Sequence, residues 1–349
     1  MKKNWSAAFQ VAAVYVGTVV GAGFATGKEI VEFFSRFGFF GLISILMSGY
    51  LLVMIGSKLM RISVQIGAKS YQEFNEFLFG KWFGMGINLF MLVMLLGVSA
   101  VMLSGAGAVF EEQLGLPKNL GIFLTIFLSI LVMVVGTKGL FAVNTIVVPL
   151  MISFSLILMI LSVSMPHFLN QLLYIPHADD GWKAVAAPFT YSALNLALAQ
   201  AVLVPIATEI DDDWTVKWGG IIGGILLTII LLAGHFTLIM LPDFEKYQIP
   251  MAVIMKNLAS SFHWVFVLVI YGEIFSSVIG DVYGLDRQLK QYIEIPSIIS
   301  VSGIFVISYF LSLIDYGRLL SYLYPSFGYV SLIFLVLLWM KPLSKIRMK

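Results

Sequence analysis

The sequence predicts an all-α polytopic membrane protein with about ten transmembrane helices. Residues of the AVILMFWYC set make up 60% of the 349 positions, and charged residues only 11%. Soluble domains are roughly half apolar and a quarter charged. The mean hydropathy is +0.96, and long stretches of the chain lack any acidic or basic side chain. A soluble fold could not cover so much apolar surface, so we expect the chain to lie within a lipid bilayer.

The uncharged stretches mark ten candidate spans, since a helix needs about 20 apolar residues to cross the hydrocarbon. They lie at 4–27, 37–57, 82–110, 119–137, 139–178, 184–208, 218–242, 257–272, 295–314 and 319–340. The fifth is too long for one helix, and Pro166 and Pro176 are expected to end it near residue 163. The first is interpreted as a retained helix, because no small-residue cleavage site closes it.

The ten spans divide into two halves of nearly equal length. We predict a first five-helix repeat at 1–163, an external connection at 164–183, a second, inverted five-helix repeat at 184–340 and a basic cytoplasmic tail at 341–349, all within one integrated membrane domain. Because five is odd, the second half enters the membrane in the opposite orientation, as in inverted-repeat transporters. Segments on the N-terminal side hold 14 Lys and Arg residues, and those on the other side hold 6. The positive-inside rule therefore predicts cytoplasmic termini.

The composition also excludes several classes of function. The net charge of +2 and the lack of a long basic stretch argue against nucleic-acid binding. The chain has no cysteine, which excludes disulfides, thiolate metal sites and cysteine nucleophiles. It contains neither an HExxH-like histidine pair nor a P-loop motif. We therefore expect neither an enzyme nor an ATP-driven motor, and no cofactor.

Two segments have sequences that favour a break in the middle of a span. Four glycines, at 17, 21, 23 and 27, fall within eleven residues of span one, and each costs a helix roughly 1 kcal/mol relative to Ala. In span six, Pro188 removes a backbone donor, and Ser192 and Asn195 could satisfy freed backbone groups. The alternatives are close helix packing through the glycines and a simple proline kink in span six.

The run from Val16 to Glu29, VGTVVGAGFATGKE, resembles the first helix of the amino acid/polyamine/organocation (APC) superfamily, whose members share the LeuT fold. The chain as a whole resembles the small bacterial YkvI-type membrane proteins, which are placed there as amino acid permeases. The resemblance implies a 5+5 inverted repeat with broken helices 1 and 6, alternating access and a central site for a small substrate. It also implies the bacterial cytoplasmic membrane as the location. It does not name the substrate.

The two broken segments are the predicted substrate site. Free amides and the dipole at the start of a half-helix attract a carboxylate, so span one would supply backbone and span six would supply side chains. Packing against lipid or core is the alternative for the two aromatic residues of span six. The predicted substrate-binding residues are Gly21, Ala22, Gly23, Phe24, Ala25, Thr26, Phe189, Tyr191, Ser192 and Asn195.

Span eight carries the most ionisable and hydroxyl groups. Glu273, Ser277 and Asp281 are spaced i, i+4 and i+8, so they share one helix face. An ionisable group at the bilayer centre costs at least ~2.5 kcal/mol, which favours a functional role. One hypothesis is proton coupling through Glu273, Asp281 and Glu29.

The resemblance implies a second hypothesis, in which a sodium ion lies between first-helix carbonyls and a pair of hydroxyls on span eight. The residues that match are Val20 and Gly23 for the carbonyls and Ser276 and Ser277 for the hydroxyls. Hard oxygen ligands suit such a cation. The alternative is that both serines only donate hydrogen bonds to carbonyls one turn back.

The predicted function is secondary active transport of a small solute, an amino acid or an amine, coupled to sodium or protons by alternating access. The expected partners are this small-molecule substrate and the lipid bilayer. An alternative from another class is a solute-binding membrane receptor or sensor subunit on the same fold, germinant-receptor-like, that binds a solute without moving it. The sequence alone does not separate the two, and uptake measurements would.

Overall fold

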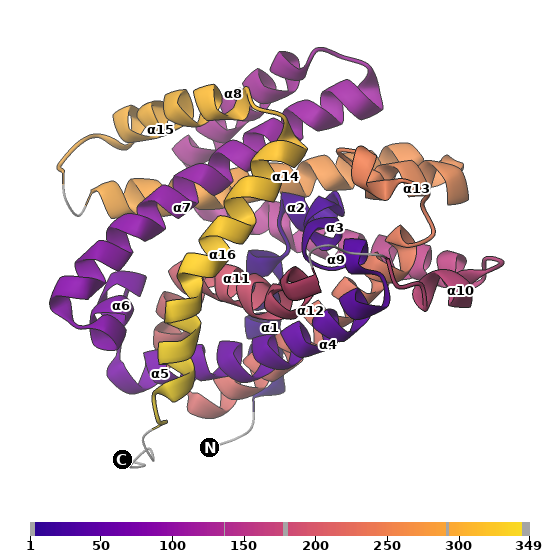
Figure 1. Ribbon diagram of the computed structural model, residues 1–349. Helices are drawn as coiled ribbons and strands as arrows, with labels where there is room; N and C mark the ends of the chain where they lie inside the picture. The colour runs from indigo at the N-terminus through magenta and orange to yellow at the C-terminus, as the bar shows by residue number, and fades with distance from the viewer. Residues whose placement is uncertain (1–3, 136, 177–180, 291–292, 344–349) are drawn as a thin grey trace.

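The computed structural model describes residues 4–135, 137–176, 181–290 and 293–343, and its regular structure in these ranges is helical (Figure 1). Two π-helical turns, η2 (Leu52–Gly56) and η3 (Val109–Gln113), continue longer helices, and η1 (Ser35–Phe37), η4 (Phe244–Lys246) and η5 (Ser260–Phe262) are short 3-10 turns. The α-helices are α1 (Trp5–Val19), α2 (Ala22–Ala25), α3 (Lys28–Phe33), α4 (Phe39–Leu51), α5 (Ser57–Ile66), α6 (Tyr71–Phe79), α7 (Lys81–Ala108), α8 (Lys118–Val135), α9 (Thr137–Val163), α10 (Phe168–Leu172), α11 (Gly181–Ile210), α12 (Asp213–Leu238), α13 (Pro250–Leu258), α14 (His263–Leu289), α15 (Ser297–Ser312) and α16 (Tyr316–Met340).

The described part of the chain contains six helices that are long and apolar enough to cross a membrane. They are Phe39–Ile66, Lys81–Gln113, Gly181–Ile210, Asp213–Leu238, Ser260–Asp286 and Tyr316–Met340. Four shorter apolar helices, Trp5–Val19, Lys118–Met133, Pro149–Val163 and Ser297–Ser312, fall on the other four predicted spans. The prediction of an all-helical fold is therefore confirmed for the described residues, and the count of ten crossings stays a prediction.

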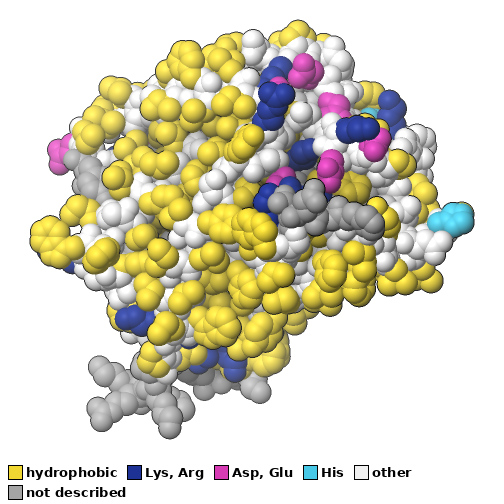
Figure 2. Space-filling view, in the orientation of Figure 1, with side chains coloured by type: hydrophobic (Ala, Val, Ile, Leu, Met, Phe, Trp, Pro, Cys, Tyr) yellow, Lys and Arg dark blue, Asp and Glu magenta, His cyan; other side chains and the backbone are white. Residues whose placement is uncertain are grey.

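The outer surface of the helices is apolar. Leu89, Phe127 and Leu268 expose 60–70% of their surface, as side chains that face lipid do. Figure 2 shows hydrophobic side chains over most of one face, with charged side chains gathered near α13 and the start of α16. On this face, charge is thus concentrated near one end of the bundle.

One end of the bundle collects the start of α1, the end of α5, the α11–α12 junction and the end of α16 (Figure 1). Arg61 of α5 forms a two-pronged ion pair with Asp213 of α12, at 2.8 and 3.0 Å. The ring of Trp5 meets Trp214 edge-on at 5.0 Å between centroids. We call this end the terminal face and the opposite end the far face. Their orientation toward cytoplasm and outside stays a prediction.

Span one is interrupted where the glycine run predicts it. Helix α1 ends at Val19, and Val20 (φ −75°, ψ 99°) and Gly21 (φ −115°, ψ −168°) are extended before α2 begins. Within the described residues, no backbone carbonyl accepts from the N–H groups of Gly21, Ala22 or Gly23. A second interruption follows at Gly27, whose φ of +84° separates α2 from α3. The predicted unwinding at residues 21–25 is thus narrower, at 20–21, with a short helical turn after it.

The prediction that span six also breaks is wrong, since α11 runs without interruption from Gly181 to Ile210. A proline in a helix deprives the carbonyl four residues earlier of its partner. Here that carbonyl belongs to Ala184, and the hydroxyl of Ser44 in α4 donates to it at 2.9 Å. The hydroxyl of Ser48 donates to the oxygen of Pro188 itself at 3.4 Å. Because α4 supplies these donors, the helix continues through the proline.

The division into two repeats, 1–163 and 184–340, stays a prediction. The connection at 164–183 contains α10 and the first turn of α11, and its residues 177–180 lie outside the described residues. The tail predicted at 341–349 is described only to residue 343. Of the predicted helix ends, that of span five near residue 163 coincides with the end of α9 at Val163.

A glycine stripe on α12 lets three helices approach one another closely. Gly219 and Gly223 face Val11 and Tyr15 of α1, and a Cβ on either glycine would lie 2.4–2.7 Å from those side chains. On the other side, a Cβ on Gly224 would lie 2.7 Å from the Cα of Val53 in η2. Small residues at such contacts are the usual means of close helix packing in membranes.

Gly224→Ala is expected to destabilise the fold, because a methyl group at 2.7 Å from backbone forces α12 away from η2. Overpacking of this kind costs about 1–3 kcal/mol. The measurement is the apparent melting temperature of the purified protein in detergent. Gly86→Ala is the matched control, since a Cβ there meets nothing within 4 Å in the described structure. Equal melting temperatures for the two variants would contradict the contact.

Candidate functional site: a cavity at the broken helix

A cavity of about 1800 Å³ extends from the terminal face to the break in the first helix. At the terminal face its lining includes the exposed side chains of Lys69, Glu209 and Lys290. Small-molecule sites usually occupy roughly 300–1,000 Å³, so the volume suffices for a solute and its access path. The inner end is lined by Gly17 and Thr18 of α1, Gly21, Glu29 of α3, Leu95, Val98 and Met102 of α7, Asn195 of α11, Ser276, Ser277, Gly280 and Asp281 of α14, and Tyr324 of α16.

Glu29 joins the broken first helix to α11. The amide nitrogen of Asn195 donates to Glu29 Oε1 at 3.3 Å and to the backbone oxygen of Tyr191 at 3.1 Å. Glu29 is only 3% exposed. A Cβ on Gly23 would lie 2.6 Å from Glu29 Oε2, so only glycine lets this carboxylate fold back over α2. Glu29 and Asn195, predicted for different roles, therefore form one cluster.

The two serines of α14 lie at the break, as the sodium hypothesis requires. Both line the cavity, and a Cβ on Gly21 would lie 3.3 Å from Ser277 Oγ. Ser276 and Ser277 also donate to the backbone oxygen of Glu273, at 3.0 and 2.8 Å. Sodium binding and hydrogen bonding to a carbonyl one turn back are compatible roles for these serines, because a hydroxyl that donates its proton keeps its lone pairs for a ligand.

The two predicted carbonyl ligands are less well placed. Val20 is buried and does not line the cavity. The oxygen of Gly23 accepts a hydrogen bond from Thr26 Oγ1 at 3.2 Å. Among the predicted sodium ligands, the serine hydroxyls are thus the ones that face the cavity in this conformation.

The carboxyl groups of α14 differ in position. Asp281 lines the cavity, and its Oδ2 has no hydrogen-bond partner in the described structure. Glu273 is fully buried, and both of its carboxyl oxygens lack a partner among the described residues. It lies outside the cavity lining. The structure brings Glu29 and Asp281 to the same cavity and leaves Glu273 one turn beyond the serines.

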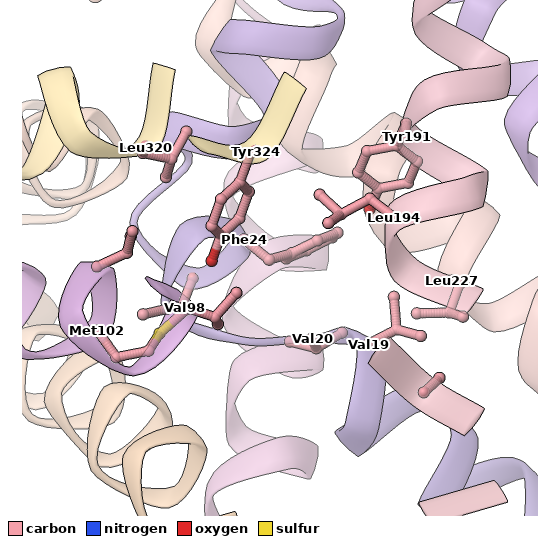
Figure 3. Packing of buried hydrophobic residues seen from close by; sticks show 14 of the residues in the cluster. Val19, Val20, Phe24, Val98, Met102, Tyr191, Leu194, Leu227, Leu320 and Tyr324 are labelled. Carbon is pink, nitrogen blue, oxygen red and sulfur yellow. The ribbon is translucent and has the colours of Figure 1, made fainter. Parts of the chain in front are cut away.

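The remaining predicted substrate residues pack in the core. Figure 3 shows the ring of Phe24 between Tyr324 of α16 and Leu194 of α11. Tyr191 packs edge-on against Phe34 at 4.8 Å between centroids. None of the following lines the cavity: Ala22, Gly23, Phe24, Ala25, Thr26, Phe189, Tyr191 and Ser192. Their role in substrate binding stays a prediction.

Two lining residues had no signal that sequence reasoning could use. Tyr324 sits in a span without a recognisable motif, and Figure 3 shows its hydroxyl directed toward Phe24 and the break. Thr18 lies within the glycine run but resembles an ordinary helix residue, since its hydroxyl donates to the oxygen of Val14 at 2.7 Å. Neither Tyr324 nor Thr18 could be assigned to the cavity without the arrangement of the helices in space.

A loop at residues 243–249, which we call the latch loop, closes the far face. Lys28 Nζ at the start of α3 donates to the backbone oxygens of Glu245 and Tyr247, at 2.7 and 3.0 Å. Glu112 of η3 accepts from the backbone N–H groups of Gln248 and Ile249, at 2.9 and 3.1 Å. The loop therefore ties the outer part of the broken helix to the end of α7.

The same loop also reaches α16. Gln248 Oε1 accepts from the backbone N–H of Gly317 at 2.7 Å. Beneath the loop, Thr26 Oγ1 and the hydroxyl of Tyr316 lie 2.8 Å apart. These contacts close off the break from the far face, whereas the cavity leaves it accessible from the terminal face.

No family model matches the chain. The membrane protein YkvI of Bacillus subtilis (strain 168) is 50% identical over 336 residues, which cover 96% of this chain and 96% of that protein. The chain belongs to the YkvI family. The protein YyaD of the same organism is 22% identical over 340 residues, which cover 97% of this chain and 98% of that protein. Family membership and the apolar helices together identify an integral membrane protein.

Solved structures similar to this YkvI-family chain include two transporters. One is the manganese transporter of Eremococcus coleocola in complex with an aromatic bis-isothiourea substituted compound. Its TM-score is 0.66 at 14% identity, and the match covers 93% of this chain and 76% of the transporter chain. The other is MHP1, a nucleobase-cation-symport-1 family transporter with bromovinylhydantoin bound. Its TM-score is 0.58 at 11% identity, and the match covers 88% of this chain and 74% of the MHP1 chain. The YkvI-family chain thus has a LeuT-like fold, and its membership of the APC superfamily stays a prediction.

Proposed function

We propose that the protein is a secondary active transporter that moves a small solute, an amino acid or an amine, by alternating access. The observation that carries the proposal is the one-sided cavity. It reaches the break at Gly21 from the terminal face, while the latch loop closes the far face. Alternating access requires such a state, in which a central site is open to one side and sealed from the other.

The ten-span 5+5 arrangement belongs to this proposal. The six long and four shorter apolar helices would be the ten crossings, with α1 to α3 together as the first. Transporters with inverted repeats place their sites beside discontinuous helices near the membrane midplane. The break at residues 20–21 supports this arrangement for the first repeat. In the second repeat, the continuous α11 supplies Asn195 from an intact helix.

Coupling to an ion is the second part of the proposal, and two carriers remain. Sodium would bind where Ser276 and Ser277 face Gly21, with hydroxyl lone pairs as ligands. Protons would be carried by the buried carboxyl groups of Glu29 or Glu273, or by Asp281, which is half-buried and lines the cavity. Buried ionisable groups of this kind commonly mark ion or proton pathways.

Reconstitution tests the proposal directly. Proteoliposomes that contain the protein should accumulate labelled amino acids or amines several-fold under an imposed sodium or proton gradient. Accumulation should cease when an ionophore dissipates that gradient, and protein-free liposomes are the control. Solute binding to the purified protein without uptake under either gradient would contradict transport and favour a receptor.

A further inference from the structure

The hydroxyl groups at the inner end of the cavity are turned toward the cavity as hydrogen-bond acceptors. Thr18 donates its proton to the oxygen of Val14 at 2.7 Å. Ser276 and Ser277 donate theirs to the oxygen of Glu273 at 3.0 and 2.8 Å. A hydroxyl has one proton and two lone pairs. What these three side chains offer to a bound solute is therefore lone pairs.

The amide and carboxyl groups of the inner end are acceptors as well. Both protons of the Asn195 side-chain amide are directed at protein oxygens, namely Glu29 Oε1 and the backbone oxygen of Tyr191. The side-chain oxygen of Asn195 is therefore left for a ligand. Glu29 is 97% buried, lines the cavity, and accepts no hydrogen bond at Oε2 within the described structure. Asp281 adds a second carboxyl group with an unpartnered oxygen.

Basic side chains do not balance these acids. Of the described residues that line the cavity, the basic ones are Lys69 and Lys290, and both are exposed at the terminal face. Lys290 lies 3.1 Å from the carboxylate of Asp286 there. The inner end thus combines two carboxyl groups with acceptor lone pairs. Among the described residues that line this end, the donors are the hydroxyl of Tyr324 and the backbone amide of Gly21. The N–H groups of Ala22 and Gly23 also lack a carbonyl partner in the described structure, but these two residues do not line the cavity.

We propose that the transported solute is a small organic cation with several N–H donors, an alkylamine or a guanidinium compound, with Glu29 as its counter-ion. This inference rests on the proposed function and narrows its substrate class. An ammonium or guanidinium group carries positive charge and only donors, and so complements a site made of acceptors. A solute that carries only a carboxylate would meet Glu29 and Asp281 with like charge and find few donors.

An inorganic cation shares the charge but fits the site less well. In the described part of the chain, no group of three or more His, Cys, Asp or Glu residues is placed to hold a metal ion. A divalent ion needs about six oxygen ligands at short distance, whereas the acceptors here line a cavity wide enough for an organic molecule. Manganese and sodium are therefore separate arms of the test.

The test is ligand binding by the intact purified protein, without a gradient. Thermal shift and equilibrium dialysis are run in potassium buffer with putrescine, agmatine, glutamate, propionate, Mn²⁺ and Na⁺ as separate probes. Putrescine or agmatine should raise the melting temperature by several degrees, since a ligand that binds the folded state stabilises it. Glutamate and propionate should have no effect.

Variants locate the binding. Glu29→Gln, which keeps the size and the bond to Asn195, should weaken amine binding tenfold or more, and Asp281→Asn should weaken it severalfold. Glu111→Gln, an exposed carboxyl group on η3 outside the cavity, should leave it within about twofold. The melting temperature of each ligand-free variant reports whether it is folded, and a Glu29→Asp variant should retain amine binding where Glu29→Gln does not.

Several outcomes would overturn the inference. One is that glutamate or propionate stabilises the protein as much as the amines do. Another is that Glu29→Gln leaves the amine affinity unchanged. The third is that only Mn²⁺ or Na⁺ raises the melting temperature and that Glu29→Gln removes this response. Failure of the proposed function gives a different result. Amine binding without uptake in liposomes would support the organic-cation site and refute transport. Uptake of a carboxylate would support transport and refute the organic-cation site.

Discussion

If sodium drives uptake, replacing Ser276 and Ser277 together by alanine is expected to abolish the sodium stimulation. Both hydroxyls line the cavity, and Ser277 lies against Gly21 at the break. Their protons are already donated to the Glu273 carbonyl, so the substitution removes the lone pairs that a sodium ion would use. Loss of two oxygen ligands leaves the cation with fewer of the hard ligands that it prefers. The measurement is initial uptake against sodium concentration in proteoliposomes.

Ser99→Ala is the matched control for this double variant. Ser99 is a buried serine of α7 whose hydroxyl donates one turn back to Leu95, at 2.8 Å, and it does not line the cavity. Its loss should leave sodium dependence unchanged. If the double variant keeps its sodium dependence, the serines are structural. If in addition Glu273→Gln abolishes proton-driven uptake, the coupling belongs to that carboxyl group.

Lys28→Met is expected to raise the population of molecules whose far face is open about tenfold. The ammonium group makes two hydrogen bonds to the latch loop, and bonds of charged groups contribute roughly 1.5–3 kcal/mol each. A net loss of about 1.4 kcal/mol already changes a conformational equilibrium tenfold. A cysteine in place of buried Leu320 reports the opening, because the natural chain contains no cysteine. Its reaction with a membrane-impermeant thiol reagent should become about tenfold faster.

Lys246→Met supplies the comparison for this experiment. Lys246 belongs to the same loop, is exposed, and pairs with Asp243 at 2.6 Å. The hydrogen bond from Lys246 to Asp243 raises the pKa of that lysine above its ordinary value, but the pair does not connect the loop to α3. Its loss should leave the reactivity of the cysteine unchanged. Equal rates in the Lys28 and Lys246 variants would show that Lys28 does not hold the far face closed.

The positions of the helices could be predicted from the sequence because lipid imposes a simple rule. Uncharged stretches became helices, and the end of α9 at Val163 follows from Pro166 three residues later. The break at Val20 and Gly21 could also be predicted, since glycines weaken a helix locally. Both features depend on residues that are close together in the chain.

Features that depend on distant residues could not be predicted. Pro188 predicts a break in span six, and only the arrangement of helices reveals that Ser44, far away in the sequence, satisfies the Ala184 carbonyl. The same holds for Tyr324 at the cavity and for the contact of Glu112 with the latch loop. The residues that close the far face are ordinary polar residues in the sequence, and their partners become identifiable when the chain is folded.

The hydroxyl of Ser44 has a consequence for how the chain is assembled during biogenesis. Until α11 packs against α4, the Ala184 carbonyl lacks the i+4 helical donor that Pro188 removes. In hydrocarbon such a group costs several kcal/mol. We therefore expect α11 to be less stable in the membrane until it packs against α4. The donor that satisfies this carbonyl comes from α4, a helix that is made much earlier in synthesis.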